Sequence, residues 1–128
     1  MSTIIADNLT GKTSAGSVTV TSEGGAATQS LQQGLAKMWH NIAGSGTVTT
    51  SDSFNVSSVS DMATGGYKSN LTNNMNNIVY AAGGNGPNQT DVGHTSIATS
   101  HYQTALRNSS DSDFDADNCC HILHGDLA

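Results

Sequence analysis

With 128 residues, the chain has room for one compact domain, or for a smaller domain with an extended arm. Its formal net charge of −6, with only four Lys and Arg residues, argues against nucleic acid as a partner, because no basic patch can neutralise phosphates. Only 35% of the residues are hydrophobic and 11% are charged. This polar, uncharged composition suits slender β structure, and a chain that buries so little core usually needs partner chains.

Membrane insertion and ordinary secretion are both disfavoured by the sequence. No apolar run approaches the length of a membrane span. The first seven residues contain neither a basic region nor a long apolar region, so we expect no signal peptide. The two cysteines, Cys119 and Cys120, are adjacent, and neighbours in sequence reach the geometry of an unstrained disulfide with difficulty. We therefore expect reduced thiols and synthesis in a cytosol.

Residues 1–25 are predicted to form an N-terminal arm. Two short β-like pieces, 3–5 and 18–21, are separated by a link rich in Gly, Asn, Ser and Thr, and Gly24-Gly25 ends the segment. Such a piece cannot hold a core by itself. It is either a flexible tail or an arm that becomes ordered against a partner.

Residues 26–39 are predicted to form the one helix of the chain. Apolar residues at spacings of four, four and three form a narrow stripe, which consists of Ala27, Leu31, Leu35 and Met38. Ser30 and Gln33 give a weak capping-box signal. The stripe is typical of a coiled-coil seam between helices, although a helix that lies on its own domain gives a similar pattern.

Residues 40–128 are predicted to form an antiparallel β-sandwich-like domain, so the fold class is mainly β. Apolar and polar residues alternate in short runs that Gly, Asn, Asp and Ser clusters interrupt. The segment 61–66 fits a hairpin turn, 78–82 reads as the most apolar strand, and 119–123 reads as the last strand. The expected core side chains of this domain are Trp39, Phe54, Val56, Tyr67 and Tyr80.

Residues 83–93 are predicted to be a loop, because they combine five Gly and Pro residues with polar ones. Exposed loops often carry function, and Asn and Tyr side chains supply adaptable contacts. The candidate binding residues are therefore Asn85, Asn88, Gln89 and Tyr102. A loop that only joins two strands is the alternative, and the acidic segment 108–118 is the next place for a binding site.

Motifs for metal binding and catalysis are weak. The acidic residues between Asp111 and Asp117 alternate as in a calcium loop, but Ala116 and Ile122 occupy the positions where an EF-hand needs Gly and Glu. The segment 119–124 contains two Cys and two His, which could form a metal site only by assembling across a three-fold axis. No nucleophile elbow or phosphate-binding glycine motif is present. We expect no enzyme activity, no resident metal and no cofactor.

Four segments carry a resemblance to a known family. They are Gly34-Leu35-Ala36-Lys37-Met38-Trp39, Gly44-Ser45-Gly46-Thr47-Val48, Asp52-Ser53-Phe54-Asn55-Val56-Ser57-Ser58-Val59-Ser60-Asp61, and Gly66-Tyr67 with Leu71, Met75 and Tyr80. Together they resemble tailed-bacteriophage tail-fibre and fibre-tip proteins. Members of that family commonly have a short β-rich arm, a Gln-rich helix that ends Ala-Lys-x-Trp, and a small β domain.

The resemblance implies a homotrimeric structural protein of the virion, assembled in the cytoplasm of a host bacterium. Its N-terminal arm would attach to other tail or head proteins, and its C-terminal domain would contact a host cell-surface glycan or protein. Several weak contacts can act together in a trimer. A head fibre or capsid decoration protein of the same kind of virion is one alternative, and a carbohydrate-binding β-sandwich module is another.

Overall fold

The computed structural model describes residues 3–14, 16–87 and 89–128, with the backbone alone described over 89–92. The chain divides into two compact units, with the boundary between Leu35 and Ala36. The secondary structure is mainly β, as predicted, and the single helix of the described residues is short. No helix in the described part of the chain has the length and apolar character needed to cross a membrane.

The first unit contains a two-stranded hairpin followed by one turn of helix. Strand β1 (Thr19–Thr21) pairs antiparallel with β2 (Thr28–Ser30), and α1 (Leu31–Gly34) follows directly. The Ser30 hydroxyl accepts a hydrogen bond from the Gln33 N–H at 3.4 Å, which confirms the capping signal. None of the described residues of this unit is buried.

The predicted helix over 26–39 is wrong in its length. The backbone is extended over Thr28–Ser30, where it pairs with β1, and it is extended again at Leu35. Gly34 ends the helix, since glycine is a poor helix former. The predicted strand at 3–5 is also absent. The four stripe residues therefore do not share one helix face, and Met38 belongs to the first strand of the second unit.

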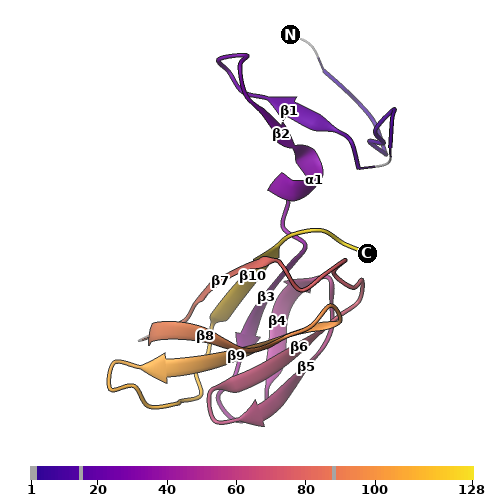
Figure 1. The fold of residues 1–128 in the computed structure, drawn as a ribbon. Coiled ribbons are helices and arrows are strands. Elements are labelled where there is room, and N and C mark those ends of the chain that lie inside the picture. Colours follow the sequence, from indigo (N-terminus) through magenta and orange to yellow (C-terminus); the bar gives the residue numbers. More distant parts are fainter. Residues whose placement is uncertain (1–2, 15, 88) are drawn as a thin grey trace. The chain divides into compact units, whose positions relative to one another are not determined.

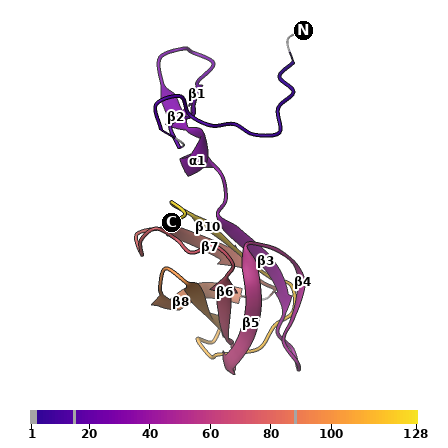
Figure 2. The ribbon, with the colours of Figure 1, turned by 90° about the vertical axis from the view of Figure 1, so that its right-hand side faces the viewer.

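The second unit consists of two four-stranded antiparallel sheets that face each other (Figures 1 and 2). Sheet I has the order β4-β3-β10-β7, and sheet II has the order β5-β6-β9-β8. The strands of sheet I are β3 (Met38–Ala43), β4 (Thr49–Phe54), β7 (Ala81–Asn85) and β10 (Cys119–His124). Those of sheet II are β5 (Val56–Ala63), β6 (Gly66–Leu71), β8 (Gln89–Ile97) and β9 (His101–Asn108). This arrangement confirms the predicted sandwich-like domain.

Predictions based on turns and alternation succeed in parts of this unit. The segment 61–66 contains the β5–β6 hairpin turn, in which Gly65 has a φ of +71°. The last strand forms as expected, with Cys119 buried on one face and Cys120 on the other. The two cysteines form no disulfide with each other, because their side chains point to opposite faces of the strand.

Two predictions about the segment 78–93 are wrong. Ile78 and Val79 are 58% and 86% exposed and precede the strand that was expected to include them. Most of the predicted loop 83–93 belongs to β7 and β8, which pair with β10 and β9. Hydrogen bonding to these partner strands outweighs the local preference of the glycines for a loop.

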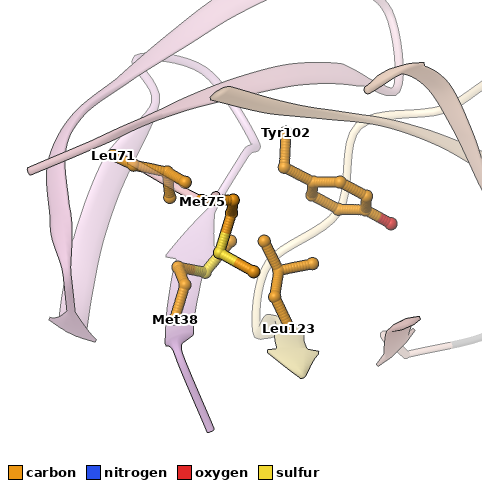
Figure 3. Close-up of a cluster of buried hydrophobic side chains, with 5 residues drawn as sticks. All are labelled: Met38, Leu71, Met75, Tyr102 and Leu123. Atoms are coloured by element: carbon orange, nitrogen blue, oxygen red, sulfur yellow. The ribbon is translucent and has the colours of Figure 1, made fainter. Parts of the chain in front are cut away.

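The core lies between the two sheets and has two clusters. Figure 3 shows the first, in which Met38, Leu71, Met75, Tyr102 and Leu123 converge from both sheets and the segment after β6. The second contains Ile42, Tyr67, Leu106, Ala116 and Cys119. The partly buried Val56 and Tyr80 pack against the first cluster.

The predicted core is correct for Tyr67 and wrong for Trp39 and Phe54. Tyr67 is fully buried, but Trp39 and Phe54 are 38% and 50% exposed. Met38 and His40 face the interior, so Trp39 between them must face outward. Phe54 lies opposite Trp39 in the β3–β4 register and therefore shares its outward face.

The acidic segment 108–118 is engaged within the domain. Asp111 and Asp113 both pair with Arg107. Asp115 accepts hydrogen bonds from the Gly65 N–H and the Tyr67 hydroxyl, at 2.8 and 3.0 Å. These contacts, together with burial, raise the pKa of Tyr67. Asp115 therefore ties this segment to the β5–β6 turn, whereas the pairs with Arg107 are local and exposed.

Neighbouring substitutions on β3 test this assignment of faces. Met38→Ala should lower the free energy of unfolding by roughly 2–5 kcal/mol, because it leaves a cavity in the core. Trp39→Ala should cost clearly less, although it removes a larger side chain. Urea unfolding followed by circular dichroism measures both values. Equal losses would mean that Trp39 is a core residue after all.

Candidate functional site

The outer face of sheet I carries a row of large apolar side chains. Phe54 on β4, Trp39 on β3 and Ile122 on β10 lie side by side in the strand register. They are 50%, 38% and 38% exposed, respectively. The row ends at Gly83 on β7, which pairs with Ile122 and has no side chain. We call this set the apolar row.

A polar row runs parallel to the apolar row on the same face. It consists of Asp52, Asn41, Cys120 and Asn85, which are paired in this order across the four strands. The Asn41 Nδ2 donates a hydrogen bond to the Cys120 Sγ at 3.3 Å. The Asn41 Oδ1 is covered and accepts no hydrogen bond from the described residues.

A hollow of about 700 Å³ lies over these two rows. It is lined by strand segments 39–41, 83–85 and 120–122, together with Asp52. Gly83 contributes no side chain, so β7 leaves space beside Ile122. The volume falls in the range of small-molecule sites. We call this space the sheet hollow.

The sheet hollow offers an aromatic surface and hydrogen-bonding groups to a ligand. Trp39 offers an aromatic surface, and the amides of Asn41 and Asn85 offer hydrogen-bonding groups. Asp52 is the one Asp, Glu, Lys or Arg residue in the lining, and it only accepts hydrogen bonds when ionised. A ligand with a flat apolar face and donor groups at its rim would match this surface.

Directly beneath this face, on the inner side of sheet I, lies a buried histidine pair. The His40 Nε2 and His121 Nδ1 are 2.7 Å apart, and the Ser69 Oγ of sheet II lies 3.1 Å from the His40 Nδ1. All three side chains are almost fully buried. The His121 Nε2 has no hydrogen-bond partner among the described residues. The Ser–His contact therefore links the two sheets within the core.

Both histidines are held in the neutral form. Burial lowers the pKa of His40 to about 4. Burial and repulsion from His40 lower the pKa of His121 to about 3. A hydrogen bond between the rings needs one donor and one acceptor nitrogen, which two protonated rings cannot supply. Sequence reasoning missed this pair, and the available signal was that each histidine alternates with residues of the core.

The structure separates the four residues predicted to bind a receptor. Asn85 is exposed and lines the sheet hollow. The prediction for Tyr102 is wrong, because this side chain is 2% exposed and packs in the first core cluster. Alternation along β9 turns Tyr102 inward with Thr104 and Leu106. Asn88 and the side chain of Gln89 lie outside the described residues.

The residues considered for metal binding do not converge within this one chain. Among the described residues, no group of three or more His, Cys, Asp or Glu side chains could hold a metal ion. In the segment 119–124, Cys119 and His121 face the interior, whereas Cys120 and Ile122 face outward. Strand geometry therefore divides the soft ligands between two faces.

Comparisons with known proteins give no family assignment. No protein-family model, no curated protein and no solved structure matches this chain. The resemblance to phage fibre proteins stays a prediction. Functional inference therefore depends on the fold and on the side chains of sheet I.

The histidine pair predicts a loss of stability in acid. Unfolded histidines have a pKa of about 6.5, whereas the folded values are far lower. Between these values the unfolded chain binds more protons, so stability falls as the pH drops from about 6.5 to about 3. Since one pKa unit corresponds to about 1.4 kcal/mol, the pair accounts for a loss on the order of several kcal/mol.

Urea unfolding at a series of pH values measures this dependence. The variant His121→Leu, which removes one buried titrating ring, should show a shallower slope below pH 6.5. The variant His124→Gln is the matched control on the same strand, because His124 lies outside the pair. Identical slopes for the wild type and His121→Leu would show that the pair does not control acid stability.

Proposed function

We propose that this chain is a non-enzymatic structural protein of a virion, a homotrimeric phage tail fibre or fibre tip that contributes to host attachment. The observation that carries this proposal is the contrast between the two units. The described residues before Ala36 include no buried one, whereas the unit from Ala36 onward has a continuous core between two sheets.

The first unit has the properties of an assembly segment. Five of its large apolar side chains are more than half exposed, namely Ile4, Ile5, Leu9, Val20 and Leu35. A two-stranded hairpin alone is at best marginally stable in water. Burial of these side chains against other chains would supply the missing core. The partners in the proposal are two further copies of this chain and other tail or head proteins of the virion.

The proposed trimer seam is smaller than the sequence suggested. Ala27, Leu31 and Leu35 remain available to it, because they are exposed or half-buried in the single chain. Met38 does not, because it is fully buried in the domain core. With only one turn of helix, the seam would combine hairpin and helix side chains and would not be a coiled coil.

The second unit has the properties of a display domain. Its core is complete within one chain, so the sandwich can hold surface groups in fixed positions without a partner. Three copies side by side would present three identical outer faces, and weak contacts to a host surface would then act together. The resemblance to fibre proteins adds support from the sequence.

Substitutions at the proposed seam test the trimer. The double variant Leu31→Asp with Leu35→Asp should dissociate the assembly, because it places carboxylates where apolar contacts between chains are expected. Analytical ultracentrifugation at micromolar concentration measures the change. The double variant Thr10→Asp with Thr19→Asp adds the same charge at exposed polar positions of the same unit, and it should remain trimeric. A wild-type chain that sediments as a folded monomer would contradict the proposal.

Immunogold electron microscopy of released phage particles tests the assignment to a fibre. Antibodies against the unit from Ala36 onward should label the tail, because the proposal places this domain on a tail appendage. Label on the head would assign the protein to head fibres or capsid decoration. Particles that carry no label, although the protein is present in the lysate, would sink the virion assignment.

A further inference from the structure

The apolar row has no structural reason to be exposed. The core clusters beneath it are complete, and none of them uses Trp39, Phe54 or Ile122. Three adjacent large apolar side chains on one face leave apolar surface in contact with water. Burying such surface is favourable by a free energy of about 25 cal/mol per Å². Contiguous patches of this kind generally mark binding sites.

We infer that the sheet hollow, flanked by Phe54, binds a neutral oligosaccharide. This inference names the receptor class for host attachment, and its biological setting rests on the function proposed above. A pyranose ring has an apolar C–H face that can lie on Trp39 and Phe54. Its hydroxyl groups project from the ring edge, where Asn41, Asp52 and Asn85 are placed to meet them.

Hydroxyl groups match the hydrogen-bonding needs of the polar row. The Asp52 carboxylate accepts hydrogen bonds only, and the Asn41 Oδ1 receives none from the described residues. A buried acceptor without a donor costs roughly 1–3 kcal/mol. Rotation about the terminal torsion of Asn41 is soft, so this oxygen can turn toward a ligand hydroxyl.

Charge favours a neutral sugar over other occupants. The lining of the sheet hollow includes no Lys or Arg, and Asp52 and the net charge of −6 would repel a sulfated or uronic-acid glycan. If the same face of a second copy packed on the apolar row, it would cover Asp52. That face would supply no Lys or Arg to pair with the Asp52 carboxylate. Burying an unpaired carboxylate is strongly unfavourable.

The chain contains its own reporter for the test, because Trp39 is its one tryptophan and lies in the site. The purified full-length protein is titrated with maltohexaose, cellohexaose and chitohexaose while tryptophan emission is recorded. At least one of these neutral sugars should change the emission in a saturable way. An oligogalacturonate of matched length should bind more weakly, because it is anionic.

Two variants identify the binding surface. Phe54→Ala and Asn85→Ala should each weaken the affinity by about fivefold or more, through the loss of a stacking surface or a hydrogen bond. Met62→Ala is the matched control, because Met62 is 53% exposed on β5 of the other sheet, and it should leave the affinity unchanged. Thermal melting checks that all variants are folded. For Trp39→Ala, titration calorimetry replaces fluorescence and should show no binding heat.

Three results would overturn the inference. The first is the absence of any saturable change with the neutral sugars at millimolar concentration. The second is an affinity that Phe54→Ala and Asn85→Ala leave intact. The third concerns the emission of Trp39 without sugar. If Trp39 emits as a shielded indole in the wild type and as an exposed indole in the dissociated Leu31→Asp with Leu35→Asp variant, another copy of the chain covers the face.

The same measurements separate this inference from the proposed function. Sugar binding by the purified protein does not depend on where the protein lies in a particle. Binding combined with unlabelled particles would therefore remove the virion assignment and keep the site. Labelled tails combined with no sugar binding would keep the virion assignment and remove the site.

Discussion

The register between β3 and β10, the two central strands of sheet I, is the constraint on which the rest of the domain depends. It places His121 opposite His40 and Ile122 opposite Trp39. Because side chains alternate between faces, this one pairing sends the first pair into the core and the second to the surface. A slip of β10 by one residue would turn His121 outward and Ile122 inward, and it would disrupt both the core and the apolar row.

The same register explains which parts of the fold the sequence could predict. Local signals were sufficient for the 61–66 turn, where Gly65 provides a positive φ, and for the alternation in 119–123. They were insufficient for Met38, whose spacing fits both a helix stripe and an inward strand position. Pairing with β10, which is distant in sequence, decides between the two. The large size of the Trp39 side chain was also misleading. It suggested a core residue, but Met38 and His40 on either side occupy the inward positions.

The candidate site was harder to predict, because β7, one of the strands that line it, has a sequence typical of a loop. Gly83 and Gly84 lower the strand propensity, yet β7 pairs with β10 over its whole length. Gly84 is required by a close approach: a Cβ there would lie 2.5 Å from the His121 Cδ2 and 2.7 Å from the Cys120 carbonyl oxygen. Two glycines of β7 therefore act on opposite faces. Gly84 makes room for His121 on the inner face, and Gly83 leaves the outer face open beside Ile122. Of the predicted binding residues whose side chains the structure describes, Asn85 lines the sheet hollow and Tyr102 does not.

The same strand pairings therefore determine which side chains lie on the inner face of sheet I and which lie on its outer face. The inner side is kept neutral, since two uncharged histidines occupy it and the nearest aromatic, Tyr102, has a pKa raised to about 12 by burial. Charged groups of the 108–118 segment are paired with Arg107 or hydrogen-bonded to the domain. What remains exposed on the outer face is mainly aromatic and amide surface. An outer face of this kind is suited to contacts that depend on shape, stacking and hydrogen bonds.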